Sequence, residues 1–344
     1  MDRLNLTGTE IADIHELIAR VLSTYAAVDA PDFLHDAGLL AHDMPQRVRR
    51  LLNNFRMVEP ADGACLISGW DIDDVRLGTT PTHWKWEDTV PRRSAEDVLL
   101  VLLGSLLGDV FGWLTQQDGH IVHEIMPIRE HDDEQIETGS RQELIWHTDD
   151  AFHPYRADYI GMMCLRNPDK IPTTFGYFDA ATLPPDYVDV LFKARFLMRP
   201  DDSHLESNRS DLDNHVLGNR QPVDAAYKAM NSVNFEPGAV ALLEGDHNSP
   251  YIRIDPCTTT ALDNDLLAKM ALDALVQQIS GTLVDVVLSP GDVIFLDNKS
   301  VVHGRRPFSP RHDGHDRWLK RVGVTRDLRK SRGDRSSATS RLIQ

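Results

Sequence analysis

A histidine and an aspartate two positions apart are the residues whose types and spacing point most directly to chemistry. His147 and Asp149 lie in the run ELIWHTDDAF, which otherwise has the composition of a half-buried strand. Side chains at positions i and i+2 of a strand leave the same face of the sheet. An ordinary core would place apolar side chains there, so the pair indicates a site.

A second histidine, far along the chain, completes a set of metal ligands. His303 follows the apolar run DVIFLDN, in the segment VVHGRRPF. Two histidines and one carboxylate on one face of a metal leave three coordination positions open, as in non-haem Fe(II) oxygenases. A 2-oxo acid can fill two of these positions and dioxygen the third. A single one of the 15 histidines would carry no such meaning, so the prediction depends on the set.

Two arginines follow His303 at a spacing that suits an anionic co-substrate. Arg317 and Arg321 lie four positions apart in DRWLKRVGVTRD, a run with strand character, so both can share one face. A guanidinium binds a carboxylate through two parallel hydrogen bonds, which suits the far carboxylate of 2-oxoglutarate. The pair alone would indicate a solvated sheet face. After two histidines and an aspartate, it indicates a co-substrate site.

The elements that must position these residues are predicted to be helices first and strands later. The first 60 residues repeat apolar side chains every three or four positions, and a further helix covers about 94–108. From about residue 120, short β-rich runs are separated by Gly, Pro, Asn or Asp. Strict β-α alternation is absent. The pattern predicts a mainly β fold with α: a double-stranded β-helix (jelly-roll) core with flanking helices.

A single oxygenase domain is expected to span residues 1–344. Within it, 1–115 is a mostly helical flank, and about 120–330 is the jelly-roll core. A polar stretch at about 200–236 is too long for an ordinary loop and is predicted to be a lid insertion or disordered. The basic segment 330–344 is expected to be a frayed tail.

Composition limits the class of partner. The 53 acidic and 36 basic residues give a net charge of -17, which disfavours nucleic-acid and anionic-membrane surfaces and mildly favours a cationic small molecule. No secretory signal opens the chain, and the most apolar run, 98–113, is interrupted by Asp109. The few, widely spaced cysteines indicate a reducing compartment. We therefore expect a cytoplasmic protein with no membrane or nucleic-acid partner.

Two long segments resemble a known family. WHTDDAFHPYRADYIGMMCLRNPD and HGRRPFSPRHDGHDRWLKRVGVTRD closely resemble the clavaminate synthase-like Fe(II)/2-oxoglutarate oxygenases. Within that group the chain is most similar to hydroxylases of free amino acids such as arginine, lysine, citrulline and asparagine. The resemblance is dense in these segments and looser from about 110 to 330. It implies Fe(II) held by His147, Asp149 and His303, with 2-oxoglutarate and dioxygen as co-substrates.

The resemblance also implies roles for residues around the metal. Arg317 would bind the C5 carboxylate of 2-oxoglutarate, with Thr174 of IPTTFG as a hydroxyl donor to it. Arg321 would pair with the α-carboxylate of a free L-amino acid. Gln116 of WLTQQDG would lie near the α-amino group. The lid insertion would close over the substrate and exclude water.

A departure from the family pattern bears on the substrate. Relatives that hydroxylate arginine hold its guanidinium with several carboxylates, including a D-x-D pair, whereas SPYIRIDPC has Asp255 followed by Cys257. A guanidinium with one fewer carboxylate would be under-compensated. Asp255, helped by Asp201 of RPDDSH, suits the compact lysine ammonium. We therefore expect C3 or C4 hydroxylation of L-lysine, with L-arginine or L-citrulline hydroxylation or desaturation as alternatives.

Other interpretations remain open at this point. Asp255 could simply be a turn residue before Pro256. The fold could belong to a non-catalytic jelly-roll binding protein, but such a protein would usually have lost a metal ligand or Arg317, and all are present. A structural zinc or cupin-type site would more often have a further ligand to close the shell. The sequence leaves the oligomeric state open, a homo-oligomer included.

Overall fold

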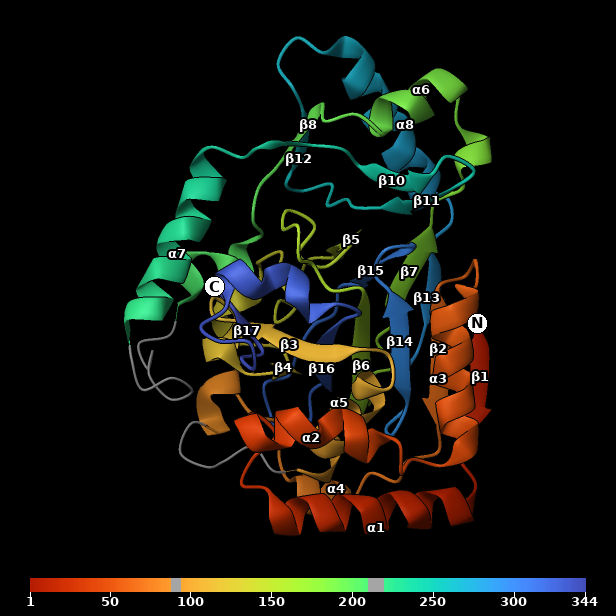
Figure 1. The fold of residues 1–344 in the computed structure, drawn as a ribbon, viewed down its shortest axis with the longest axis vertical. Helices are drawn as coiled ribbons and strands as arrows, with labels where there is room; N and C mark the ends of the chain where they lie inside the picture. Colours follow the sequence, from red (N-terminus) through yellow and green to blue (C-terminus); the bar gives the residue numbers. More distant parts are fainter. Residues whose placement is uncertain (88–93, 210–219) are drawn as a thin grey trace.

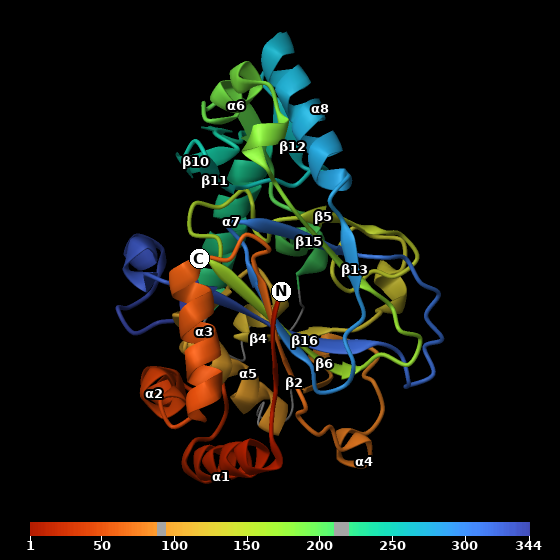
Figure 2. The ribbon, with the colours of Figure 1, turned by 90° about the vertical axis from the view of Figure 1, so that its right-hand side faces the viewer.

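The computed structural model describes residues 1–87, 94–209 and 220–344 of the chain. Figures 1 and 2 show helices at one end of the molecule, sheets in the middle and a mixed cap at the other end. The helical end contains α1 (Gly8–Thr24), α2 (Pro31–Ala41), α3 (Gln46–Val58), the short α4 (Asp74–Leu77) and α5 (Ala95–Ser105). These helices and one face of the large sheet share a hydrophobic core.

Local sequence explains where these helices begin. Thr7 and Glu10 form a capping box before α1, and Ser94 and Asp97 form a second one before α5. The predicted helix at about 94–108 corresponds to α5. Its apolar side chains are buried on nearly all sides, because the helix lies between the other helices and the large sheet.

The large sheet forms one wall of the central region. Its order is β1-β2-β14-β6-β16-β3-β17, and β4 also pairs with β16. The bounds are β1 (Asp2–Asn5), β2 (Ala64–Ser68), β3 (Asp109–Trp113), β4 (Val122–Ile125), β6 (Tyr159–Arg166), β14 (Val293–Asp297), β16 (Trp318–Thr325) and β17 (Leu342–Ile343). Strand β16 pairs with β3, β4 and β6, so the segment after Arg317 lies deep inside the sheet.

A smaller sheet forms the facing wall. Its order is β13-β7-β15-β5, with β5 (Leu144–His147), β7 (Thr173–Tyr177), β13 (Val284–Val286) and β15 (Val301–Arg305). Residues of both sheets contribute to one hydrophobic cluster between them, including Met162 and Leu319 of the large sheet and Phe175 and Val301 of the small one. The protein is thus a mixed α/β fold with two packed sheets, and the jelly-roll connectivity stays a prediction.

The cap is built from the chain between the strands of the small sheet. It contains α6 (Pro185–Leu191), α8 (Leu266–Ser280) and α7 (Arg220–Phe235). Its strands are β8 (Phe196–Met198), β9 (Ala239–Val240), β10 (Leu243–Asp246), β11 (Ser249–Ile252) and β12 (Thr259–Ala261). The predicted lid insertion at about 200–236 begins with short turns and ends in α7, while residues 210–219 lie outside the described part.

Short 3-10 turns connect these elements. They are η1 (Trp84–Glu87), η2 (Gln117–Gly119), η3 (Arg129–His131), η4 (Ala180–Thr182), η5 (Asp202–His204), η6 (Glu206–Asn208) and η7 (Leu328–Asp334). Two of them lie next to predicted site residues: η5 carries residues of the lid insertion, and η2 follows directly after Gln116.

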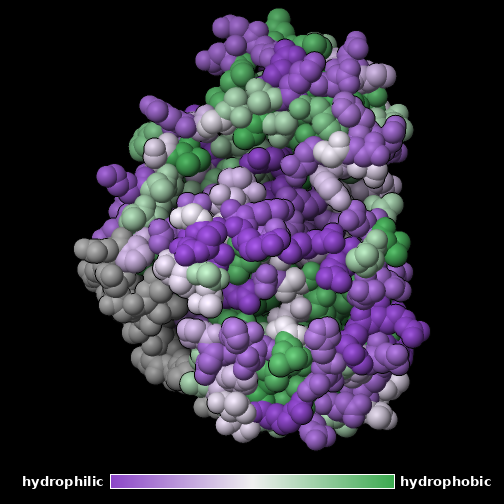
Figure 3. Space-filling model, in the orientation of Figure 1, coloured by the Kyte–Doolittle hydropathy of each residue, from purple (hydrophilic) through white to green (hydrophobic). Residues whose placement is uncertain are grey.

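Figure 3 shows hydrophilic side chains over much of one face, interrupted by hydrophobic patches.

The two ends of the chain differ from expectation. The flank that was predicted to be mostly helical also supplies β1, β2 and β3 to the large sheet. The tail is not frayed, because β17 pairs in parallel with β3 and Ile343 is only 1% exposed. Arg335 is also buried, and its guanidinium donates to backbone carbonyls of the tail. No helix in the described ranges is long and apolar enough to cross a lipid bilayer.

Candidate active site

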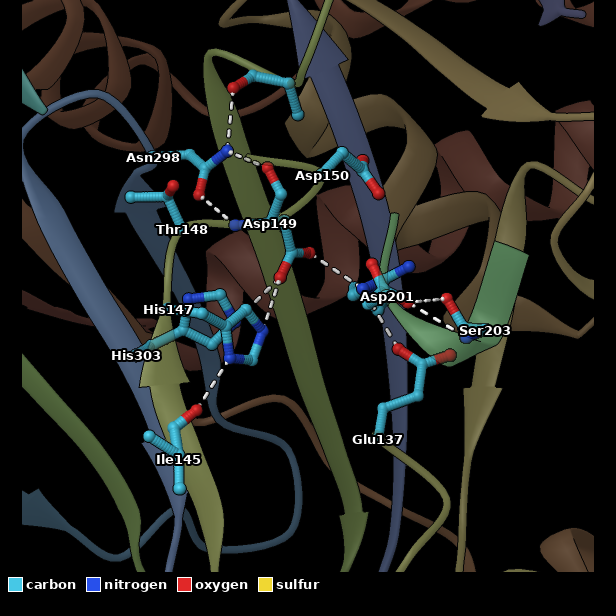
Figure 4. Close-up of polar contacts among 12 residues, drawn as sticks. Glu137, Ile145, His147, Thr148, Asp149, Asp150, Asp201, Ser203, Asn298 and His303 are labelled. Atoms are coloured by element: carbon cyan, nitrogen blue, oxygen red, sulfur yellow. Dashed lines mark hydrogen bonds and ion pairs between the residues drawn. The ribbon is translucent and has the colours of Figure 1, made fainter. Parts of the chain in front are cut away.

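Strands β5 and β15 place two of the predicted metal ligands side by side. His147, the last residue of β5, is the register partner of His303 in β15. Asp149 lies just beyond β5, and its Oδ1 atom is 3.2 Å from Nε2 of each histidine. Figure 4 shows both imidazoles converging on this carboxylate. The structure therefore brings the three predicted ligands into one cluster.

The chemistry of this cluster fits a divalent metal. Nδ1 of His147 lies 2.8 Å from the Ile145 carbonyl, which can only accept, so this nitrogen carries a proton and leaves Nε2 to bind. Burial would lower the pKa of His147, but its hydrogen bond with Asp149 raises it to about 9. A cation bound here takes the place of that proton. Two imidazoles and one carboxylate suit Fe(II) and leave further coordination positions free.

Asn298 holds the backbone at the metal-ligand turn, and the sequence analysis missed it. Its Oδ1 accepts a hydrogen bond from the Asp149 N–H at 2.8 Å, while its Nδ2 donates to the carbonyls of Asp149 at 3.1 Å and Ala157 at 2.9 Å. Asn298 is buried on the turn between β14 and β15, five residues before His303. A fully bonded buried amide fixes Asp149 relative to that histidine. The signal in the sequence was a lone amide between two apolar strands.

Arg317 offers a buried guanidinium without a carboxylate partner. It is 7% exposed, and its Nη2 donates to Thr173 Oγ1 at 3.1 Å. Its Nε has no hydrogen-bond partner, and no acidic side chain within the described residues forms an ion pair with it. Burial lowers the pKa of Arg317 to about 10. An unsatisfied buried cation on a cavity wall is suited to an anionic ligand.

The hydroxyl beside Arg317 belongs to Thr173, whereas the sequence analysis assigned it to Thr174. Adjacent residues of a strand point to opposite faces, so only one of the two can face the cavity. Thr173 is among the residues that line it, and the Thr174 hydroxyl instead lies beside Gly304. The prediction was therefore displaced by one residue.

Arg321 and Gln116 meet at the other predicted binding position. Arg321 Nη2 donates to Gln116 Oε1 at 3.3 Å, and its Nη1 lies 2.7 Å from Asp149 Oδ2 and 3.0 Å from Glu137 Oε2. Burial would lower the pKa of Arg321, but Glu137 and Asp149 hold it above its ordinary value. Glu137 was missed by the sequence analysis, because it lies in a polar loop without any spacing signal.

A buried ion network supports β16 from behind. Arg321 faces the cavity, and Lys320 points to the opposite face, where it is 1% exposed. Its Nζ lies 2.7 Å from Asp97 Oδ1 of α5 and also contacts Glu124 of β4. Trp318 Nε1 donates to the same Glu124 carboxylate at 2.6 Å. The strand that carries the site arginine is thereby tied to a helix and to a neighbouring strand.

The site opens into a cavity of about 300 Å³ between the two sheets and the cap. Asp255 lines it and also accepts a hydrogen bond from the Cys257 N–H at 2.8 Å, so its predicted pocket position and its turn role coexist. Burial, reinforced by Asp201, raises the pKa of Asp255. Cys257 also lines the cavity, and burial raises the pKa of its thiol to about 11, so the thiol is neutral.

The lid segment, defined here as residues 201–206, forms another part of the wall. Asp201 Oδ1 accepts from the Ser203 N–H at 3.0 Å, and Ser203 Oγ accepts from Gln116 Nε2 at 2.7 Å. Figure 4 shows Asp201 and Ser203 on the same side of Asp149 as Glu137. Within the described residues, neither Asp201 nor Asp255 forms an ion pair with a basic side chain.

Comparisons with known proteins agree with this geometry. The family model "Taurine catabolism dioxygenase TauD, TfdA family" matches residues 247–322. An L-ornithine/L-arginine 3-hydroxylase of Catenulispora acidiphila is 39% identical over all of both chains. An enduracididine beta-hydroxylase of Streptomyces hygroscopicus is 38% identical over 99% of each. An L-lysine 3-hydroxylase of C. acidiphila is 28% identical over 97% of this chain and 87% of its own.

Solved structures give the same picture. The non-heme iron oxygenase OrfP in complex with Fe, succinate and (3S)-hydroxy-L-Arg is 40% identical and matches with a TM-score of 0.92 over all of both chains. Its complex with Fe and alpha-ketoglutaric acid matches with a TM-score of 0.86 at 40% identity, over 99% of this chain and all of that one.

Proposed function

Because the chain belongs to the clavaminate synthase-like family of Fe(II)/2-oxoglutarate oxygenases, and within it to the free amino-acid hydroxylases, we propose that it hydroxylates a basic L-amino acid. It is an Fe(II)- and 2-oxoglutarate-dependent dioxygenase. We further propose that hydroxylation occurs at C3 or C4 and that the core has the connectivity of a double-stranded β-helix.

The observation that carries the substrate class is a pair of cavity carboxylates, Asp201 and Asp255, that form no ion pair with a basic side chain among the described residues. Asp201 and Asp255 both line the cavity, and the pKa of Asp255 is raised by burial and by Asp201. Two such carboxylates near each other are unfavourable until a positive charge lies between them. A cationic head group at the end of the amino-acid side chain supplies that charge. A neutral side chain would leave both carboxylates without an ion-pair partner from the substrate.

The α-carboxylate and α-amino group of the substrate find partners on the other side. Arg321 keeps its positive charge and offers a fork of donors to a carboxylate. Gln116 Oε1 and Glu137 lie beside this guanidinium and can accept from an α-ammonium group. The substrate would thus be held at both ends, with its side-chain carbons directed past the cluster of His147, Asp149 and His303.

The co-substrate would be held by a different arginine. Arg317 and Thr173 would bind the far carboxylate of 2-oxoglutarate, and the cluster of His147, Asp149 and His303 would hold the iron. When bound, iron and 2-oxoglutarate supply the oxidising chemistry, in which dioxygen converts 2-oxoglutarate to succinate and carbon dioxide and hydroxylates the substrate. The protein selects which carbon faces the metal and keeps water out.

Similarity supports L-ornithine and L-arginine ahead of L-lysine. The relative that acts on ornithine and arginine is 39% identical, and the lysine 3-hydroxylase is 28% identical. L-lysine was expected because Cys257 stands in place of a second carboxylate, and L-lysine as the substrate stays a prediction. Ornithine satisfies both considerations, because its compact ammonium needs fewer carboxylates than a guanidinium does.

Product analysis tests the proposal. The protein, reconstituted anaerobically with Fe(II), is supplied with dioxygen, 2-oxoglutarate and L-ornithine, L-arginine, L-lysine, L-citrulline or L-asparagine in separate reactions. We expect a basic amino acid to gain one oxygen atom, with NMR placing the hydroxyl at C3 or C4. Loss of two hydrogens instead would identify desaturation. Turnover of L-asparagine or L-citrulline in preference to every basic amino acid would refute the cationic substrate class.

A further inference from the structure

His204 is a fully buried histidine of the lid segment with no role in the proposed mechanism. It is 0% exposed, and both of its ring nitrogens are hydrogen-bonded. Nε2 lies 2.9 Å from Asp150 Oδ1, and Nδ1 lies 2.7 Å from Thr115 Oγ1. The ring also packs against Phe152 and Trp113, with centroid distances of 5.1 and 5.6 Å. A histidine satisfied on every side is a structural anchor for the segment that carries it.

Asp150 is the partner of His204 in the core, and it directly follows the metal ligand Asp149 in the sequence. Its second carboxylate oxygen accepts a hydrogen bond from Trp113 Nε1 at 2.7 Å. Its backbone is left-handed, with φ of 51°, a conformation that costs energy in a residue with a side chain. Such a conformation persists only where the surroundings fix it. Trp113 and His204 provide that fixation from two separate elements.

The anchor holds the part of the lid segment that reaches the cavity. One carboxylate oxygen each of Asp150 and Asp201 and one ring nitrogen of His204 all lie within 4.8 Å of one another. Asp201 lines the cavity, and Ser203 accepts the hydrogen bond from Gln116. The bond between His204 and Asp150 therefore connects the turn of the metal ligand to the residues that line the substrate pocket.

We propose that His204 and Asp150 are positioning residues for the amino-acid substrate. Their hydrogen bond holds the lid segment closed over the cavity, so that Asp201 and Ser203 stand at fixed positions against the side chain and the α-amino end. This inference rests on the proposed function for its kinetic readout. It predicts that the bond governs binding of the amino acid and leaves binding of 2-oxoglutarate, on the Arg317 side, unchanged.

The variant His204→Phe tests the inference by separating the two substrates. We expect the KM for the basic amino acid to rise about tenfold or more, as for one lost charge-assisted hydrogen bond. The Kd of 2-oxoglutarate should stay within about twofold, and kcat at saturating amino acid should change far less than KM. Succinate formed without hydroxylated product should increase, because a loose lid segment admits water. An unchanged KM for the amino acid would overturn the inference.

Three further variants separate positioning from general packing. His204→Gln keeps a donor toward Asp150 and should restore most of the affinity. Asp150→Asn tolerates the left-handed backbone but loses one of two acceptors, so it should raise the same KM. His153→Phe is the matched control, because His153 packs on the Trp113 ring at 4.5 Å without a hydrogen bond to the lid segment in the described chain. An equal rise in KM for His153→Phe would contradict the inference.

A second readout keeps the inference independent of the substrate assignment. Amide hydrogen exchange in residues 201–206 should be faster in His204→Phe than in the wild type or in His153→Phe. If the wild type turned over no basic amino acid, the proposed function would be wrong. The exchange rates would still show whether the hydrogen bond between His204 and Asp150 holds the lid segment in place. Equal exchange in all three proteins would overturn the anchor even if turnover were as proposed.

Discussion

Thr173 and Thr174 are adjacent on β7 and allow a matched test of the co-substrate site. Thr173→Val removes the hydroxyl that contacts Arg317 and should raise the KM for 2-oxoglutarate about three- to tenfold, the effect of one hydrogen bond. Thr174→Val is the control and should leave that KM unchanged, because Thr174 does not line the cavity. Steady-state kinetics at saturating amino acid measure both. A larger effect from Thr174→Val would contradict the assignment.

The head-group site can be tested by changing its charge. Asp255→Asn should raise the KM for a basic amino acid about tenfold or more, with little change for 2-oxoglutarate, because it removes a carboxylate that faces the cavity. Kinetics with L-ornithine and L-arginine measure the effect. If the variant had the same KM as the wild type for each of the two amino acids, the head group would lie elsewhere.

Cys257 provides the opposite change. Cys257→Asp adds a further carboxylate beside Asp255 and should raise kcat/KM for L-arginine relative to L-ornithine several-fold, because a guanidinium uses an additional carboxylate better than a compact ammonium does. Competition between the two amino acids in one reaction measures the ratio directly. A shift toward ornithine would refute this reading of Cys257.

At the scale of residues, the side chains that could be predicted from the sequence are those whose chemistry is unusual for their element. His147 and Asp149 were recognised because a strand face seldom carries both, and Arg321 because it shares a run with Arg317. The assignment of Thr174 failed by one position, since a shift of one residue in a strand exchanges its faces. Glu137 and Asn298 lie in loops, where no periodicity relates sequence to direction.

At the scale of elements, β16 must stay in place for Arg321 to take its proposed role in binding the substrate. Lys320→Met breaks the buried contacts with Asp97 and Glu124 and should lower the free energy of unfolding by about 3–5 kcal/mol, because it removes a buried ammonium that contacts both carboxylates. Lys269→Met is the control: it breaks an exposed pair on α8 and should cost at most about 0.5 kcal/mol. Chemical denaturation measures both. Equal losses would contradict a supporting role for the network.

Helices were easier to predict than the outer strands of the large sheet. The apolar repeats before residue 60 are visible within a short window, so the N-terminal helices follow from local sequence. Strands β1, β2 and β17 are short, and β2 pairs with β14 more than 200 residues away. Local patterns contain no information about such partners. The basic tail also resembled a disordered segment, although Leu342 and Ile343 at its end are buried.

At the scale of the whole molecule, the C-terminal end of the chain pairs with β3, the strand that leads toward Gln116. The N–H groups of Gly112 and Leu114 donate to the carbonyls of Arg341 and Ile343 at 3.0 and 2.9 Å. Deleting residues 341–344 should lower Tm by several degrees, because β3 loses these hydrogen bonds. The deletion should also raise the KM for the amino acid, because β3 leads into Gln116. Calorimetry and kinetics measure the two effects. An unchanged Tm would show that the tail contributes nothing to the fold.

The net charge of -17 and the carboxylates of the cavity both favour the proposed cationic substrate. The most direct test compares L-arginine with L-citrulline, which has nearly the same shape but no charge. The measurement is succinate formation by the wild-type protein with Fe(II) and 2-oxoglutarate, at equal concentrations of either amino acid. The account predicts strong stimulation by L-arginine and at least about tenfold weaker stimulation by L-citrulline. Equal stimulation by both would contradict it.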